Sequence, residues 1–391
     1  MNSAWSIKKL GEVCHSDLGK TLNQSKDTGN LYPYLCAVNI QWDKIDLSTL
    51  KKTRFEEDET ERYSVKKGDL LVCEGGDIGR AAIWDIKTPI RYQNALHRIR
   101  FNESMLPRFC LYFLRFLKNK GILDSQYGKG VTIKHLVKSS LLSIPIPVPT
   151  INEQRRIVDE LDLLTGIIGD KECQLRDFDA LAESIFYEMF GDPVKNEKGW
   201  PVKPIKDSVE EMFLGPFGSS LKTDCYVPQE LSYCMVYEQK HAIKKTLSQE
   251  NHYINKEKFN SLKRFSVGPG DFIMSCRGTI GKIYELPADA PLGIIHPSLM
   301  KIRLKEGAYS HNFFKVVLGK VVERQDRNGG VVKMAITAKE LGQIKIVVPP
   351  IELQNKFNEI IEQIEEAKKS ITQSMSGIQT LLDKRMNDYF S

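Results

Sequence analysis

The chain contains 391 residues, of which 41% are hydrophobic and 27% are charged, which suits a soluble globular protein of about two to three domains. No apolar run approaches the roughly 20 residues of a membrane span, and the N-terminal MNSAWSIKKLGE lacks the apolar core of a signal peptide, so we expect a cytoplasmic protein. The net charge of +6, with a pI near 8.7, is compatible with nucleic-acid binding without requiring it.

The first 148 residues predict a small α+β domain. Residues 69–73 and 81–84 are apolar runs beside glycines and predict short strands, whereas 107–118 has the apolar spacing of a helix. Residues 144–149 read IPIPVP, and because proline excludes a helix, we expect extended chain there.

A long helix is predicted over 149–191. Its apolar residues recur at steps of three, four or seven, which is the pattern of a helix packed along one other helix. At about 1.5 Å per residue, such a helix would be roughly 57 Å long, more than a single globular core uses. We therefore interpret it as a strut that holds two parts of the molecule apart.

The whole arrangement is repeated. Residues 349–391 match 149–191 without gaps at an offset of 200, so that Gln154 pairs with Gln354 and Phe190 with Phe390. Residues 62–71 resemble 264–273, and 76–80 resemble 278–282. We predict globular domains at 1–148 and 192–348, spacer helices at 149–191 and 349–391, an antiparallel coiled coil of the two helices, and pseudo-two-fold symmetry. The residues predicted to pack the helices or bind a partner are Gln154, Ile157, Leu161, Leu164, Phe178, Leu181, Gln354, Ile364, Ile371, Ile378 and Leu381.

Catalytic and metal-binding motifs are missing from the sequence. It contains no G-x-x-x-x-G-K-[ST], H-E-x-x-H or G-x-S-x-G, and neither D/N/S-P-P-Y/F nor F-x-G-x-G, the motifs of an amino-methyltransferase. The eight cysteines form no C-x-x-C and no zinc spacing with histidine, so we expect reduced thiols and no metal. In a duplicated chain, these absences favour a binding protein over an enzyme.

Glycine-rich loops are the candidate binding sites. Residues 74–80 (EGGDIGR) and 276–282 (CRGTIGK) each end in a cation, and glycine lets backbone N–H groups approach a phosphate. Further pairs lie at 127–132 and 328–333, and at 18–21 and 215–222; turns with solvated lysines are the alternative. Two histidines could read a base edge, although structural roles are at least as probable. The predicted DNA-binding residues are Lys20, Gly76, Gly79, Arg80, His97, Lys129, Thr132, Lys222, Arg277, Gly278, Thr279, Lys282, His296 and Lys333.

Several phrases together resemble the specificity (S) subunits of type I restriction-modification systems. They are the IPIP of residues 144–147 with Glu153-Gln154, the GTIG of residues 278–281, and the FGDP of residues 190–193. The resemblance covers essentially the whole chain, although Leu353 stands where the first copy has Glu153.

This resemblance implies two target-recognition domains, each reading one half of a split, asymmetric DNA site. It also implies two helices that form an antiparallel spacer and dock two methyltransferase (M) subunits, which bind S-adenosylmethionine and methylate adenine. The chain itself would then be non-catalytic and hold no cofactor, and a restriction (R) subunit would join to cleave DNA. Two alternatives stay open: a methyltransferase or nuclease with a divergent site, and a coiled-coil scaffold with no DNA role.

Overall fold

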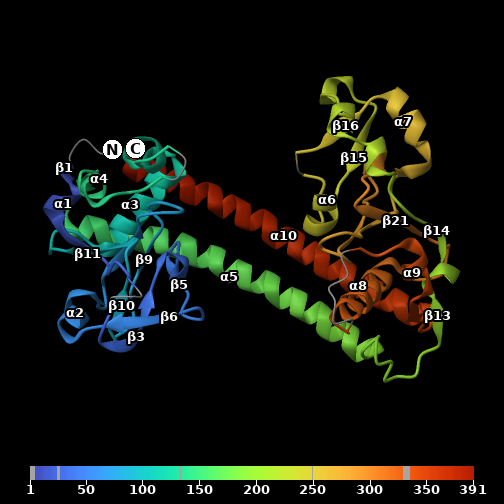
Figure 1. The fold of residues 1–391 in the computed structure, drawn as a ribbon, viewed down its shortest axis with the longest axis horizontal. Coiled ribbons are helices and arrows are strands. Elements are labelled where there is room, and N and C mark those ends of the chain that lie inside the picture. Colours follow the sequence, from blue (N-terminus) through green and yellow to red (C-terminus); the bar gives the residue numbers. More distant parts are fainter. Residues whose placement is uncertain (1–4, 24–26, 132–133, 249, 329–334) are drawn as a thin grey trace. The chain divides into compact units, whose positions relative to one another are not determined.

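The structure, a computed structural model, describes residues 5–23, 27–131, 134–248, 250–328 and 335–391 (Figure 1). The chain divides into two compact units. The first comprises Met1–Cys173 with Ile371–Ser391, and the second comprises Gln174–Ser370, so each long helix contributes to both. Within the described residues, none of the helices has both the length and the apolar composition needed to cross a membrane.

The first unit is built from short strands around one buried helix. Its strands are β1 (Ser6–Lys9), β2 (Cys14–Leu18), β3 (Asn30–Leu35), β4 (Ile40–Gln41), β5 (Lys44–Ile45), β6 (Lys51–Phe55), β7 (Ser64–Val65), β8 (Leu70–Cys73), β9 (Ala81–Ile83), β10 (Ile90–Tyr92), β11 (Leu96–Phe101) and β12 (Pro145–Val148). Its helices are α1 (Leu10–Val13), α2 (Glu57–Arg62), α3 (Pro107–Asn119), α4 (Lys138–Leu142) and the first part of α5 (Ile151–Phe190), with the last part of α10 (Ile351–Phe390).

The second unit contains a closely similar set of elements. Its strands are β13 (Val202–Pro204), β14 (Val209–Leu214), β15 (Cys234–Tyr237), β16 (His252–Ile254), β17 (Ser266–Val267), β18 (Phe272–Ser275), β19 (Ile283–Glu285), β20 (Gly293–Ile295), β21 (Leu299–Leu304) and β22 (Lys345–Val347). Its helices are α6 (Gln239–Lys244), α7 (Lys256–Leu262), α8 (His311–Asn328), α9 (Ala338–Gln343), the last part of α5 and the first part of α10.

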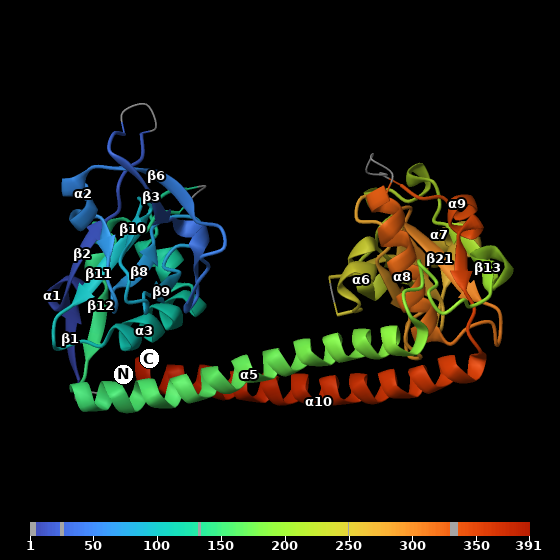
Figure 2. The ribbon, with the colours of Figure 1, turned by 90° about the horizontal axis from the view of Figure 1, so that it is seen from below.

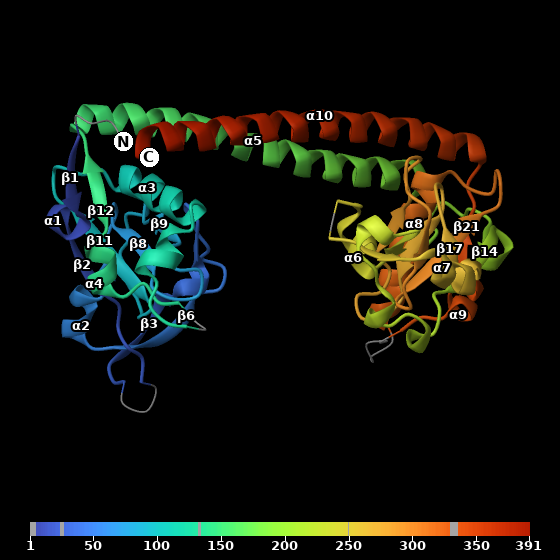
Figure 3. The same ribbon diagram turned by 90° about the horizontal axis from the view of Figure 1, so that it is seen from above.

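The two units share one sheet topology. The antiparallel sheet β2-β11-β8-β9 of the first unit corresponds to β14-β21-β18-β19 of the second. The mixed sheet β6-β3-β10-β7 corresponds to β16-β15-β20-β17, and in each the inner pair is parallel. A two-stranded pair, β1-β12 (Figure 3) or β13-β22, completes each unit. The mixed helix-and-sheet class and the internal repeat predicted from the sequence are therefore both observed.

An aromatic cluster joins α3 to the end of α10 in the first unit. Phe390, only 1% exposed, lies 5.4 Å from Phe109, 5.6 Å from Phe113 and 5.7 Å from Phe116, measured between ring centroids. Pro107 starts α3, a position where its missing N–H costs nothing. Figure 2 shows α3 between the strands and the red end of α10.

The second unit repeats this cluster with the end of α5. Phe190 lies 4.6 Å from Phe313 of α8 and 5.5 Å from Phe357 of α10, and Phe186 contacts both partners. Phe190 and Phe390 stand 200 residues apart, and each closes the core of its own unit. Phe190 and Phe390, which lie one residue before the predicted ends of the two long helices, are thus core residues.

Two glutamines lock the starts of the long helices. Gln154 is fully buried, accepts a hydrogen bond from the Leu106 N–H (2.8 Å) and donates to the Pro149 carbonyl (2.9 Å). Gln354 likewise accepts from the Ser310 N–H (3.0 Å) and donates to the Pro349 carbonyl (2.8 Å). Because both side chains are buried and bonded within the chain, their observed role is to hold each helix against the start of α3 or α8.

Charged contacts join the long helices inside each unit. In the first unit the Glu160 carboxylate of α5 accepts hydrogen bonds from Arg385 (3.0 Å) and Tyr389 of α10. The Arg385 guanidinium holds the pKa of Glu160 below its usual range. In the second unit Lys368 of α10 lies 2.8 Å from Asp179 of α5. In the first unit, therefore, the beginning of α5 lies beside the end of α10.

The seam between the helices differs in part from the predicted one. Ile157, Leu161, Leu164 and Ile364 are buried as predicted, and Phe178, Ile371 and Ile378 are half-buried. Leu181 and Leu381, however, are 46% and 45% exposed. Their places in the cores are taken by Phe186 and Leu382. Leu381 lies about 100° around its helix from Leu382, and Leu181 lies about 140° from Phe186, so the prediction that these two leucines pack the helices together is wrong, whereas their binding of a partner stays a prediction.

Candidate nucleic-acid interface

The predicted glycine-rich regions gather at one edge of the first unit. The Gly19 N–H donates to the Leu96 carbonyl (3.1 Å), and the Glu74 N–H donates to the Ala95 carbonyl (3.0 Å). The Leu136 N–H in turn donates to the Glu74 carbonyl (2.7 Å). We call residues 18–21, 74–80, 93–97 and the described part of 127–136 the first loop cluster.

The second unit brings its equivalent residues together in the same way. The Gly215 N–H donates to the Leu299 carbonyl, the Cys276 N–H to the Ser298 carbonyl and the Ile336 N–H to the Cys276 carbonyl, each at 3.0 Å. We call residues 215–222, 276–282, 296–299 and 335–336 the second loop cluster. Segments that are far apart in the sequence thus form one surface in each unit, joined by equivalent backbone hydrogen bonds.

Glycine is required where β2 and β14 end. A Cβ on Gly19 would lie 2.2 Å from the Gln93 carbonyl carbon, and a Cβ on Gly215 would lie 2.3 Å from the His296 carbonyl oxygen. Both distances are far below van der Waals contact, so a side chain would force the backbones apart. These glycines therefore build the loop clusters and bring the loop after β2 or β14 against the neighbouring turn.

We call residues 74–80 and 276–282 the central loops of the two clusters. Each central loop has two positive-φ glycines, and the two have different surroundings. Gly79 (φ 81°) and Gly281 (φ 82°) are buried, and a Cβ would lie 2.3 Å from Leu123 or 2.7 Å from Val322. Gly76 (φ 74°) and Gly278 (φ 65°) are exposed. The second glycine of each loop thus serves close packing inside the unit, and only the first is open to a ligand.

Lys20 and His97 are corrected to structural roles. Lys20 is 6% exposed and pairs with Glu59 (2.6 Å) and Asp27 (3.3 Å). His97 is fully buried, its Nε2 lies 2.7 Å from the Leu136 carbonyl, and burial lowers its pKa to about 4. A phosphate or base edge cannot reach either side chain, because both are buried inside the first unit.

The cations that end the central loops also contact their own unit. Arg80 is half-buried and donates from Nη2 to the Ala37 carbonyl (2.8 Å). Lys282 pairs with Glu323 of α8 (3.3 Å) and lines a groove of about 750 Å³ in the second unit.

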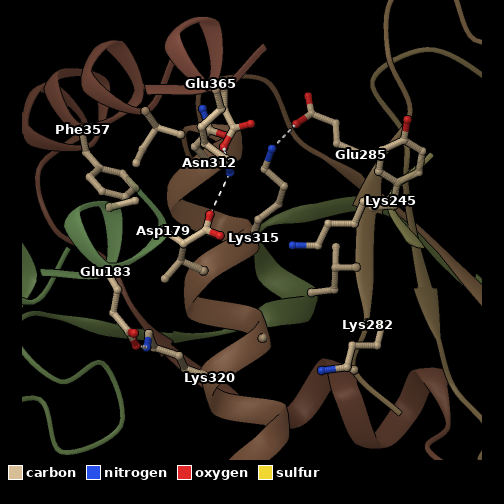
Figure 4. Close-up of a pocket in the computed structure, with 18 of the residues that line it drawn as sticks. Asp179, Glu183, Lys245, Lys282, Glu285, Asn312, Lys315, Lys320, Phe357 and Glu365 are labelled. Atoms are coloured by element: carbon tan, nitrogen blue, oxygen red, sulfur yellow. Dashed lines mark hydrogen bonds and ion pairs between the residues drawn. The ribbon is translucent and has the colours of Figure 1, made fainter. Parts of the chain in front are cut away.

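Ion pairs line this groove (Figure 4). Lys315 pairs with Glu285 (3.0 Å), and Lys320 pairs with Glu183 (2.5 Å). Lys282 therefore points along α8 into a charge-balanced groove. This position makes Lys282 a weaker candidate for a phosphate contact than the exposed Arg277.

The exposed residues of the clusters are the remaining candidates. Gly76 and Lys129 are exposed in the first loop cluster, and Lys222, Arg277, Gly278 and Thr279 in the second. His296 is half-buried, donates to or accepts from Ser298 Oγ (2.8 Å), and burial lowers its pKa. Thr132 and Lys333 lie outside the described residues.

The sequence reasoning missed residues that shape the second loop cluster. Gln239 donates from Nε2 to the Arg277 carbonyl (2.8 Å) and fixes the tip of the central loop. Phe217 is 86% exposed on the turn after β14. The sequence Gly-Pro-Phe-Gly predicts a turn, but it does not indicate that the phenylalanine ring faces solvent.

Comparison with known proteins agrees with these features. Residues 2–175 match the protein family described as the type I restriction modification DNA specificity domain. Over 392 aligned residues, the chain is 24% identical to a Methanocaldococcus jannaschii protein named for the specificity subunit of type I restriction enzyme MjaX, covering 94% of this chain and 91% of that protein. It is 26% identical over 230 residues to the type I restriction enzyme MjaIX specificity subunit of the same organism, covering 52% and 51%.

Two solved structures share the fold. One is a chain of a type I R-M system solved to explain complex assembly and conformational transition, with a TM-score of 0.59, 18% identity, and coverage of 100% of this chain and 98% of that one. The other is the type I restriction-modification S subunit from M. genitalium, with a TM-score of 0.54, 15% identity, and coverage of 98% and 96%.

Proposed function

We propose that this chain, a specificity subunit of a type I restriction-modification system, reads an asymmetric DNA site in two parts through its two loop clusters. The observation that carries this proposal is the recurrence of the loop cluster. Equivalent backbone hydrogen bonds build it in both units, whereas its exposed side chains differ. A shared backbone framework that carries different side chains suits two domains that bind DNA in the same way but prefer different sequences.

Within each unit, the exposed cations would supply contacts to phosphates, which position a protein on DNA, and the remaining polar tips would contact bases. In the second unit, Arg277 would contact a phosphate, and the neighbouring Thr279 hydroxyl would be available to a base edge. In the first unit, Lys129 has the corresponding positioning role.

The long helices would form the antiparallel spacer and, as part of the same proposal, dock two methyltransferase subunits. The contacts of α5 with α10 inside each unit support an antiparallel arrangement. Leu181 and Leu381, exposed to nearly the same degree and 200 residues apart, are candidate contacts for two copies of one partner. The chain would be non-catalytic: the partner would bind S-adenosylmethionine and methylate adenine, and a restriction subunit would cleave DNA.

A selective change in one loop cluster tests the proposal. Cells expressing the methyltransferase partner would carry the wild-type chain or the double variant Arg277→Ala, Thr279→Ala, and methylated adenines would be mapped across the genome. We expect one half of the methylated site to lose sequence preference while the other half is unchanged. Lys282→Ala is the matched control, because this lysine lies in the groove and pairs with Glu323. Relaxation of both halves, or of neither, would contradict the proposal.

A further inference from the structure

Phe217 is the most exposed aromatic side chain among the described residues of the second loop cluster. Its side chain is 86% exposed. It belongs to the turn Gly215-Pro216-Phe217-Gly218, which directly follows β14. A single exposed apolar side chain is ordinary at a protein surface, so the case for a ligand rests on the turn that holds this ring and on the cations near it.

The turn is anchored on both sides of the ring. On the N-terminal side, the Gly215 N–H donates to the Leu299 carbonyl (3.0 Å), and Pro216 is buried. On the C-terminal side, the Ser220 N–H donates to the Phe217 carbonyl (2.8 Å), and Leu221 is 4% exposed in a core cluster of the second unit. The backbone that carries Phe217 is therefore fixed, and the ring is presented outward by a held turn.

The surroundings of the ring suit nucleic acid. Lys222 follows it in the same loop, and Arg277 is exposed on the central loop, whose Cys276 N–H donates to the Ser298 carbonyl beside this turn. The nearest acids in sequence are Glu211, which pairs with Lys301 (2.5 Å), and the exposed Asp224. Aromatic rings next to cations are typical of surfaces that stack on bases and contact phosphates.

We infer that Phe217 is a wedge that enters the DNA half-site read by the second unit and partly unstacks one base step. Apolar wedges of this kind press between neighbouring base pairs and widen the step they enter. This inference rests on the proposed function and deepens it, because it names the side chain that gives the second unit its apolar base contact.

The position of the first unit that corresponds to Phe217 is not aromatic. Aligning Gly19 with Gly215 places Lys20 at the position of Pro216 and Thr21 at the position of Phe217. Lys20 turns inward to its ion pairs with Glu59 and Asp27. The distortion is therefore expected in one half-site alone, which makes the inference specific to the second unit.

Fluorescent DNA tests the inference in the complex of the chain with its methyltransferase subunits. The probe is a duplex that carries the site mapped by adenine methylation, with 2-aminopurine placed in turn at positions of each half-site other than the methylated adenines, because methyltransferases flip their target base out of the stack. The 2-aminopurine brightens when it is unstacked. We expect brightening within the second half-site only, and loss of the signal in Phe217→Ala. This variant should bind the duplex about 5-fold to 100-fold more weakly, from the measured range for base–aromatic stacking.

Two variants control for nonspecific effects of an apolar surface. Leu231→Ala removes another exposed apolar side chain of the second unit, 70% exposed, and should leave binding within 2-fold. Phe217→Trp keeps a flat ring and should retain the fluorescence change.

The possible outcomes separate this inference from the proposed function. If the wild-type complex binds the duplex but Phe217→Ala binds equally well, the wedge is refuted and the proposed function stands. If Phe217→Ala instead reduces assembly with the methyltransferase subunits, measured by mass photometry, Phe217 is a protein contact and the wedge is refuted. If the wild-type complex shows no preference for the mapped site, the proposed function fails, and the wedge fails with it.

Discussion

Replacing Phe390 with alanine should open the first unit where α10 ends. Phe390 is 1% exposed and has three phenylalanine rings of α3 within 5.7 Å, so the substitution removes a fully packed ring and leaves a cavity. Substitutions of this type cost about 3–5 kcal/mol.

Hydrogen–deuterium exchange measures this loss in each unit separately, which global unfolding of a two-unit chain does not. Amides of α3 that open with this core should exchange roughly 100-fold to 4,000-fold faster in Phe390→Ala, since each 1.4 kcal/mol corresponds to a factor of ten. Amides of α8, in the second unit, serve as the internal reference and should be unchanged. Leu381→Ala, at a position 45% exposed, is the matched control and should change α3 exchange little. Less than tenfold acceleration of α3 in Phe390→Ala would refute the packing argument.

Two further predictions concern the loop clusters. Burial lowers the folded-state pKa of His97 to about 4 from 6.5, so the unfolded chain binds more protons below pH 6.5 and the stability of the first unit falls on acidification. Between pH 7 and 5 the free energy of unfolding of the first unit should fall by about 2 kcal/mol from this histidine. Hydrogen exchange of β11 amides should show this loss in the wild type but not in His97→Gln. An equal pH dependence in the wild type and the variant would contradict the prediction. Gly215→Ala should displace loop 215–222, because the added Cβ would lie 2.3 Å from the His296 carbonyl oxygen. Gly218→Ala is the control, since a Cβ at Gly218 would meet open space. Similar hydrogen exchange of this loop in the two variants would count against the close approach at Gly215.

The repeated architecture could be predicted because the amino-acid sequence itself repeats over a long range. Two helices with apolar residues at regular steps, and an offset of 200 between copies, indicate α5 and α10 without any knowledge of contacts. The sequence predicted less accurately which side of each long helix faces the core of its unit. Leu181 and Phe186 are both apolar, and it is packing against Phe313 of α8 and Phe357 of α10, not the pattern of the helix itself, that makes Phe186 the buried residue.

The candidate site was predicted at the level of segments and less well at the level of side chains. The glycine-rich segments meet in each unit, because glycine at positions such as Gly215 permits close backbone approach. The direction of a lysine is set by partners far away in sequence. Lys20 turns inward because Glu59, on α2, lies within 2.6 Å, and no local pattern around Lys20 indicates this carboxylate. Exposure of Phe217 likewise depends on how the turn is anchored at both ends.

The most direct test of the account lengthens the two long helices where the compact units divide. Four residues would be inserted between Cys173 and Gln174 and four between Ser370 and Ile371, and methylated adenines would be mapped in cells that supply the partner subunits. Four helical residues add roughly 6 Å, which corresponds to about two base pairs of DNA. The account predicts that both half-site sequences are retained and that the non-specific spacer between them grows by about two base pairs. Altered half-site sequences with an unchanged spacer would contradict it.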